Sequence, residues 1–227
     1  MGPTRARAQY IQVHRPLPWP MDDEGQVSWK PAVPQIFQAE LMEQCNAATV
    51  AYAELRTLAS KHPPADMEGR IFWSRRVWSR VQAILAANAA INRILWPSPD
   101  KYRGEAACSR SRQRGWSVRA AMEIRDERPT VGGHVYKALE RFDEVLDDVQ
   151  VKSPDDKRLG WLISRGTTDE EALAAKGALR YYGVNSNIVQ VGDETCNLLE
   201  VVSWVEGLMD FIKYSGGFVD SIPNNPQ

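Results

Sequence analysis

Hydrophobic residues after position 34 recur at steps of three and four, the spacing that places side chains on one face of an α-helix. The first such segment begins after Pro34 and ends before Pro63, because proline suits a first helical turn and disrupts a helix interior. Its apolar positions are Ile36, Phe37, Leu41, Cys45, Ala48, Tyr52, Leu55 and Leu58. The same spacing predicts four more helices, at about 67–95, 105–124, 131–149 and 197–214.

The segment after position 160 follows a second pattern. The run "TTDEEALAAKGA" predicts a short helix, in which Thr168 and Glu171 stand in capping-box relation. The next run, "LRYYGVNSNIVQVGDET", has strand-prone residues on either side of "NSN" and predicts a β-hairpin between about 179 and 193. The predicted fold is therefore mainly α: a helical bundle of about five helices with a small C-terminal β-hairpin.

Prolines and glycines mark the limits of this bundle. Prolines recur through residues 1–33 and prevent a long helix there, so this segment is predicted to be an irregular arm. Residues 34–215 make the predicted bundle domain, and residues 216–227 a loose C-terminal tail. Gly115 lies inside the third predicted helix, where a glycine costs about 1 kcal/mol relative to alanine.

The composition is that of a folded globular protein, with 43% hydrophobic residues, 25% charged residues and a net charge of −1 over 227 residues. Such a charge produces no long-range attraction toward nucleic acid or an anionic membrane. The N-terminus lacks the apolar run of a signal peptide, and no stretch reaches the ~20 apolar residues of a membrane span. We therefore expect a cytoplasmic protein without a membrane partner. Cys45, Cys108 and Cys196 lack metal-binding spacing and are expected to be buried, reduced thiols.

Acidic side chains cluster in the fourth predicted helix. Asp143 with Asp147, and Glu144 with Asp148, are i,i+4 pairs of the kind that hold a divalent cation. A di-metal bundle would also need Glu-x-x-His motifs on facing helices, and the chain's 3 histidines offer none. We therefore expect a solvated acidic face, with no metal and no cofactor. The absence of a nucleophile elbow and of a phosphate-binding glycine loop also argues against the common hydrolases and nucleotide enzymes.

The segment "KYRGEAACSRSRQRGWSVRAAMEIRDER" is rich in arginine around one tryptophan. Arginine beside an exposed aromatic ring binds single-stranded RNA through phosphate contacts and base stacking. In the other interpretation, arginines such as Arg112 and Arg119 pair with the acidic face of the next helix and fasten the bundle. The short distance between the two segments in the sequence favours this second interpretation. The RNA-binding candidates are Arg110, Arg112, Arg114, Trp116, Arg119 and Arg141.

The third and fourth predicted helices, "RGWSVRAAMEIRDERPTVGGHVYKALERFDEVLDD", resemble a group of uncharacterised bacterial helical proteins, and the resemblance covers about half of the chain. The motif of that group is similar to the R-N-x-x-x-H motif of HEPN domains, the helical nucleotide-binding and RNase modules of toxin and defence systems. The resemblance implies a catalytic arginine and histidine that act on RNA without a metal. In that frame, however, Tyr136, Lys137 and Arg141 occupy the arginine, asparagine and histidine positions. Arginine is too basic to accept a proton in catalysis.

The leading hypothesis is therefore a non-catalytic, HEPN-like helical binding or assembly module of a bacterial defence or toxin–antitoxin type system. It would be a homodimer through its third and fourth helices, with RNA or a protein as partner. The alternative is a metal-independent RNase. Its candidate catalytic residues are Arg128 and His134, at an R-x5-H spacing that Pro129 and a glycine pair interrupt. Plain RNA binding by the arginine-rich segment is the third hypothesis.

Overall fold

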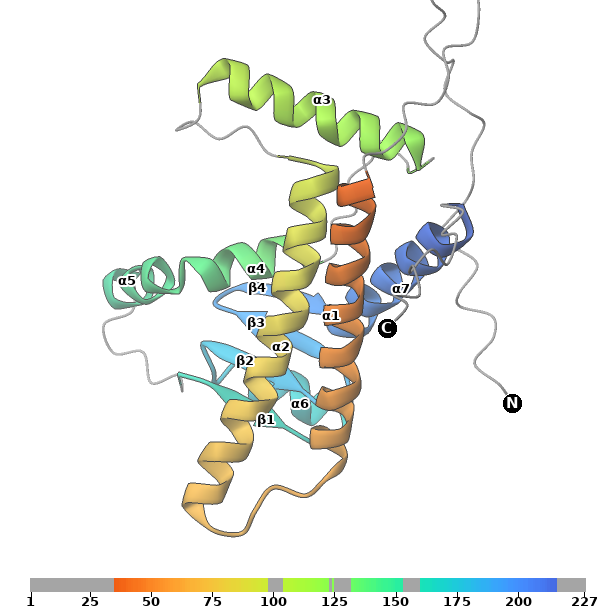
Figure 1. Ribbon diagram of the computed structural model, residues 1–227. Coiled ribbons are helices and arrows are strands. Elements are labelled where there is room, and N and C mark those ends of the chain that lie inside the picture. The colour runs from red at the N-terminus through yellow and green to blue at the C-terminus, as the bar shows by residue number, and fades with distance from the viewer. Residues whose placement is uncertain (1–34, 98–103, 123, 125–131, 153–159, 216–227) are drawn as a thin grey trace, which may run out of the picture.

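The computed structural model describes residues 35–97, 104–122, 124, 132–152 and 160–215 (Figure 1), so the predicted arm and tail lie outside the described residues. These residues form seven helices: α1 (Gln35–Ser60), α2 (Met67–Leu95), α3 (Glu105–Ala121), α4 (Gly133–Glu140), α5 (Phe142–Lys152), α6 (Thr168–Ala175) and α7 (Leu198–Ser215). They also form four strands: β1 (Leu162–Ser164), β2 (Arg180–Gly183), β3 (Ile188–Val191) and β4 (Glu194–Asn197). A mainly helical fold with a small β component is confirmed, but the prediction of about five helices and one hairpin was too low.

Helices α1 and α2 form a long antiparallel pair (Figure 1). The N-terminus of α2 is capped by Asp66, whose carboxyl group accepts a hydrogen bond from the backbone N–H of Gly69 at 2.6 Å. The predicted apolar stripe of α1 is buried at Leu41 and Leu58 and at most positions between them. Ile36 was also predicted to face inward, but it is 72% exposed, because the first turn of α1 is open to solvent.

The sheet has the strand order β1-β2-β3-β4. Strands β2 and β3 form the predicted hairpin, in which Tyr181 lies opposite Gln190, and their turn contains Asn187 with a left-handed φ of 57°. Strand β4 pairs antiparallel with β3, whereas β1 pairs parallel with β2. The β1–β2 connection passes through α6, as a parallel pair requires. Both outer strands were missed because three or four residues are too few for alternation to be recognised.

The cap of α6 lies one residue before the predicted position. Thr167, rather than Thr168, is the N-cap: its Oγ1 accepts from the N–H of Glu170 at 3.3 Å, and Glu170 accepts from the N–H of Thr167 at 2.7 Å. The predicted partner, Glu171, is instead 1% exposed. Its two oxygens accept backbone N–H groups of the β2–β3 turn at 3.0 and 2.8 Å. Because two threonines are adjacent, the sequence was compatible with a capping box of Thr167 with Glu170 or of Thr168 with Glu171. Glu171 is buried and bonded to the β2–β3 turn, so the capping box uses Thr167 and Glu170.

Two clusters of buried side chains form the core. The first lies between the α1–α2 pair, the sheet and the start of α7, and includes Leu55, Val81, Tyr182, Val189 and Val202. The second joins α1, α2, α3 and α7, and includes Leu41, Ile91, Val118, Val205 and Ile212. The sheet therefore covers one face of the helix pair, and α3 rests on the end of the pair where α1 begins (Figure 1).

The predicted helix at 131–149 is two helices, because α4 ends at Glu140 and the φ of −117° and ψ of 39° at the next residue, Arg141, are not helical. Neither proline nor glycine marks this break in the sequence. Val135, at the start of the predicted apolar stripe, is buried, and Phe142 packs against the first core cluster. Leu146, farther along the same stripe, is 44% exposed. The stripe therefore holds α4 on the core but does not extend along α5.

The cysteines are free thiols, and Cys45 and Cys196 are buried as predicted, whereas Cys108 is partly exposed. Burial raises the pKa of the Cys45 thiol to about 12, although Lys213 opposes the shift. Burial also raises the pKa of the Cys196 thiol to about 12, and Glu200 adds to the shift. Both side chains are therefore packing groups rather than reactive thiolates.

We expect the protein to lose stability as the pH rises from about 9 to about 12. An unfolded cysteine ionises near pH 9, whereas the two buried thiols keep their protons, so alkaline pH favours the unfolded state. At about pH 10 the loss should be about 1 kcal/mol for each buried thiol. Urea unfolding of the wild type and of a Cys45→Ala/Cys196→Ala variant at neutral and alkaline pH checks this. Equal losses in the two proteins would contradict the assignment.

Candidate functional site

Helix α3 carries most of the predicted RNA-binding residues, and it lies across the ends of α1 and α2 (Figure 1). The crossing depends on Gly115, which is buried where α3 passes over the end of α2. A Cβ atom at this position would lie 2.5 Å from Cδ of Pro97 and 2.8 Å from the carbonyl oxygen of Leu95. The glycine that weakens the isolated helix is therefore what lets α3 approach its neighbour.

Two of the predicted arginines hold α3 in place. Arg114 donates to the carbonyl oxygen of Arg93 at 3.4 Å, and its guanidinium lies 5.5 Å from the centre of the Phe37 ring. Arg119 donates to the carbonyl oxygen of Leu95 and lies 5.6 Å from the Trp96 ring. Arginines do fasten the bundle, as one interpretation held, but these contacts are with backbone carbonyls and aromatic rings of α1 and α2.

The other side of α3 is open to solvent. Ser109, Arg112, Gln113 and Trp116 follow at helical spacing and are all exposed, with Trp116 at 42%. Arg110 is also exposed. Among the described residues, no carboxyl group lies within ion-pair distance of Arg110 or Arg112. Arg112 and Trp116 are i,i+4 neighbours, whereas Arg110 lies about 160° around the helix axis from Arg112. We call Arg112 and Trp116 the α3 face: an exposed indole ring one helical turn from a guanidinium group without an ion-pair partner in the described chain.

Arg141, the last RNA-binding candidate, does not belong to the α3 face. It stands at the junction of α4 and α5, where it pairs with Glu144 at 3.6 Å. Figure 1 shows this junction well separated from α3. Its guanidinium is 71% exposed, so the pair with Glu144 contributes little to stability.

Of the predicted catalytic pair, the structure describes His134 only, because Arg128 lies outside the described residues. His134 is the second residue of α4, and its Nε2 lies 2.8 Å from the carbonyl oxygen of Thr195 and 3.8 Å from a carboxyl oxygen of Glu194. A carbonyl oxygen accepts only, so Nε2 carries a proton in this contact. His134 therefore ties α4 to β4, and this nitrogen is not free to act as a base.

The residues in the HEPN frame make a structural network on α4. The guanidinium of Arg93 lies 5.9 Å from the Tyr136 ring and 3.5 Å from a carboxyl oxygen of Glu140. Burial raises the pKa of the Tyr136 phenol, Glu140 adds to the shift, and Arg93 opposes it. Lys137 is exposed. These contacts link α4 to α2 and leave no charged pair poised for catalysis among the described residues of this frame.

The acidic side chains of α5 show no metal centre. Asp143, Glu144 and Asp147 are exposed, while the side chain of Asp148 lies outside the described residues. In the described ranges, no group of three or more His, Cys, Asp and Glu side chains is placed to hold a metal ion. No helix of those ranges combines the length and the apolar character needed to span a membrane.

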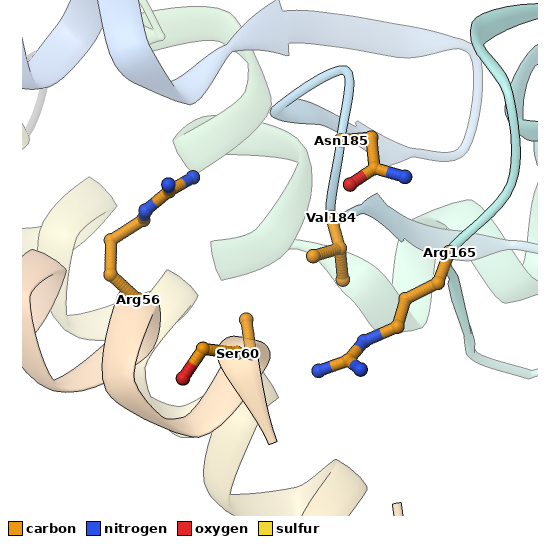
Figure 2. A pocket seen from close by; sticks show the side chains of 6 residues that line it. Arg56, Ser60, Arg165, Val184 and Asn185 are labelled. Atoms are coloured by element: carbon orange, nitrogen blue, oxygen red, sulfur yellow. The ribbon is translucent and has the colours of Figure 1, made fainter. Parts of the chain in front are cut away.

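The structure also shows a pocket that the sequence did not indicate. Arg56 and Ser60 of α1 face Arg165, which follows β1, and Asn185, which lies in the turn after β2, across a space of about 280 Å³ (Figure 2). Three segments of the chain, more than 100 positions apart at the extremes, supply these side chains. No local motif connects them, so only the folded chain brings them together.

No protein-family model, curated protein or solved structure matches this chain. The similarity to HEPN proteins therefore rests on the sequence motif alone.

Proposed function

We propose that this protein is a non-catalytic binding module that holds single-stranded RNA on the α3 face. The observation that carries the proposal is the exposed Trp116, one helical turn from Arg112, which has no ion-pair partner in the described part of the chain. An indole ring in this setting provides a stacking surface for an unpaired base, and the guanidinium group of Arg112 provides a contact for a flanking phosphate.

Single-stranded RNA is favoured over a duplex because paired bases hide the faces that an indole ring stacks on. The net charge of −1 gives no general attraction to nucleic acid, so binding should depend on the α3 face alone. One phosphate contact predicts a shallow salt dependence, with a slope of roughly −0.7 in log K against log salt. We therefore expect weak, local and stacking-dependent binding.

The non-catalytic part of the proposal is supported by α4. His134 is engaged with Thr195, and Arg141 stands in the position of the family histidine. The proposal includes two further hypotheses: that the chain is related to HEPN proteins, and that it forms a homodimer through α3 and α4. Sedimentation of the purified protein tests the dimer: a strict monomer at high concentration would remove it without affecting RNA binding by one chain.

Replacing Trp116 with alanine should lower the affinity for RNA by about 5- to 150-fold, the equivalent of one stacked base at roughly 1–3 kcal/mol. Fluorescence anisotropy with a short, unstructured RNA at low salt measures the effect. Arg112→Gln should weaken binding and flatten the salt dependence. The matched control is Arg141→Gln, which removes an exposed arginine away from α3 and should leave the affinity unchanged. Undetectable or salt-insensitive binding by the wild type would contradict the proposal.

The same RNA tests the RNase alternative. The wild type should leave the RNA intact over hours, because Nε2 of His134 is engaged by the carbonyl oxygen of Thr195. Cleavage that His134→Ala abolishes would overturn the non-catalytic assignment and restore the role of the Arg128–His134 pair. Cleavage that His134→Ala leaves undiminished would point to a contaminating nuclease.

A further inference from the structure

The pocket in Figure 2 lies at the carboxyl ends of the two parallel strands. Strand β1 ends at Ser164 and is followed by Arg165, and β2 ends at Gly183 and is followed by Val184 and Asn185. Parallel strands present their carboxyl ends at one edge of a sheet, where α/β proteins commonly bind ligands. The last turns of α1 close this edge, and they supply Arg56 and Ser60. The pocket is therefore at the end of α1 opposite to α3.

Arg165 is held in a fixed position in this pocket. Its guanidinium lies 5.7 Å from the centre of the Trp73 ring, and it donates to the carbonyl oxygen of Lys61 at the end of α1. This capping contact accounts for one nitrogen only. The Nε atom is buried and has no hydrogen-bond partner among the described residues.

The opposite wall of the pocket is equally well supported. The side-chain amide of Asn185 donates to the carbonyl oxygen of Gly166 at 2.8 Å, which joins the segments that follow β1 and β2. Behind this loop, the carboxyl group of Glu171 accepts the N–H groups of Asn185 and Ser186. Both oxygens of Glu171 are thereby engaged on the loop backbone. The polar groups that line the pocket are thus held in place before any ligand binds.

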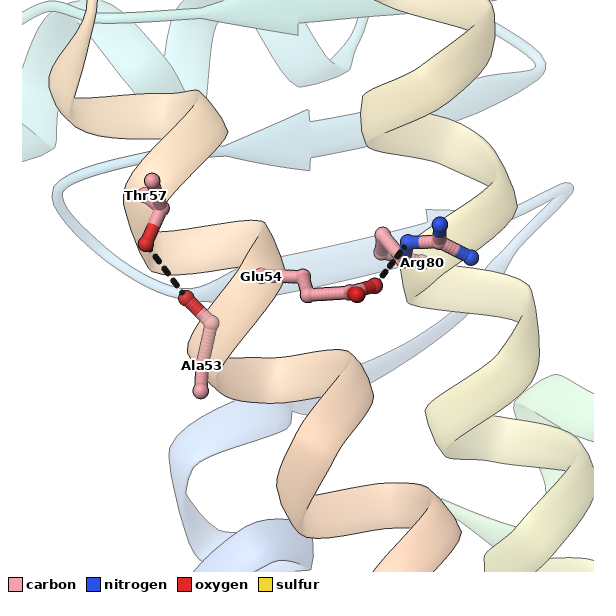
Figure 3. A network of polar contacts seen from close by, with 4 residues as sticks. All are labelled: Ala53, Glu54, Thr57 and Arg80. Atoms are coloured by element: carbon pink, nitrogen blue, oxygen red, sulfur yellow. Dashed lines mark hydrogen bonds and ion pairs between the residues drawn. The ribbon is translucent and has the colours of Figure 1, made fainter.

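The two arginines of the pocket, Arg56 and Arg165, have no ion-pair partner among the described residues. Glu54 is close to Arg56 in the sequence, but it points toward α2 and pairs with Arg80 at 2.6 Å (Figure 3). Two arginines therefore line one pocket from opposite sides, with a combined charge of about +2 (Figure 2).

We propose that this pocket binds the phosphate group of a small phosphorylated molecule. A phosphomonoester carries about −1.5 to −2 charges at neutral pH, which matches two guanidinium groups better than a single carboxylate does. Planar guanidinium groups form paired hydrogen bonds with phosphate oxygens. The volume of about 280 Å³ leaves room for a small organic part beside the phosphate.

Isothermal titration of the full chain tests the site with ribose 5-phosphate, inorganic phosphate, acetate and ribose. Ribose 5-phosphate should bind, while ribose and acetate should not bind at the same concentration. Tighter binding of ribose 5-phosphate than of inorganic phosphate identifies a phosphorylated molecule as the ligand. Equal binding of the two identifies free phosphate and also supports the site. Acetate binding as tightly as phosphate would overturn the proposal, as would the absence of phosphate binding at about 10 mM.

Arg56→Gln is the decisive variant, because this side chain is exposed and its loss should not disturb the fold. We expect it to weaken binding of ribose 5-phosphate at least tenfold, and Arg56→Lys to restore only part of the affinity because it keeps the charge but not the planar donors. Arg110→Gln, which removes the same charge on α3, is the matched control and should have no effect. Unchanged affinity in Arg56→Gln would overturn the proposal. Circular dichroism confirms that each variant is folded.

Discussion

Replacing Glu171 with alanine should lower the free energy of unfolding by about 2 kcal/mol, because two partly buried backbone N–H groups lose their acceptor at roughly 1 kcal/mol each. Glu171 is 1% exposed and holds the N–H groups of Asn185 and Ser186 at 3.0 and 2.8 Å. Its loss should free the β2–β3 turn and loosen the attachment of α6 to the sheet. Urea unfolding at neutral pH measures the change.

Two further variants on α6 isolate this effect. Glu171→Gln keeps the size of the side chain but offers one acceptor and one donor to two N–H groups, so about half of the loss should remain. Asp169→Ala removes an exposed acidic residue from the first turn of the same helix and should cost less than about 1 kcal/mol. If Glu171→Ala lowers the free energy of unfolding no more than Asp169→Ala does, the carboxyl group of Glu171 does not anchor the β2–β3 turn. Because Asn185 lines the pocket, Glu171→Ala should also weaken phosphate binding.

Gly115→Ala should destabilise the protein by about 2 kcal/mol, although alanine raises the helix propensity of α3 by about 1 kcal/mol. The added Cβ would meet Cδ of Pro97 at 2.5 Å and the carbonyl oxygen of Leu95 at 2.8 Å. Neither a proline ring nor a backbone carbonyl moves easily, so α3 would have to lift from the end of α2. The contacts of Arg114 and Arg119 would be lost with it.

The contact with Pro97 allows a double-mutant test. Pro97→Ala removes the ring atoms closest to the added Cβ, so Gly115→Ala should cost less in that background, while the clash with the Leu95 carbonyl remains. Gln113→Ala is the control on the same helix: it is exposed and should change the free energy of unfolding by less than about 0.5 kcal/mol. An increase in stability on Gly115→Ala would show that α3 does not sit as closely on α2 as this geometry requires.

Local pattern was sufficient for the long helices. The stripe from Leu41 to Leu58 predicted α1, and the same spacing predicted α2, α3 and α7, because an amphipathic helix repeats its burial every three to four residues. The β2–β3 hairpin was equally visible, since its strands are adjacent and joined by a short turn. The burial of Cys45 and Cys196 also followed from their apolar neighbours.

Other features depended on residues that are distant in the sequence. Strand β1 is defined by its parallel partner across α6, and the break at Arg141 carries no local signal. The exposure of the arginines on α3 also depended on distant residues. Arg114 packs on the Phe37 ring and Arg119 on the Trp96 ring, and these contacts leave the other arginines of α3 exposed to solvent. A periodic pattern shows that one face of a helix is buried, but not which neighbour buries it.

The sequence by itself therefore determined the mainly helical fold, the long helices and the hairpin, because these follow from the spacing of neighbouring residues. The tertiary structure alone decided the sites. It left Arg112 and Trp116 exposed on α3, turned Glu171 inward beneath a loop, and brought Arg56 and Arg165 to one pocket. The surroundings of these side chains depend on contacts between segments that are distant in the sequence, and such contacts produce no periodic pattern of residues along the chain.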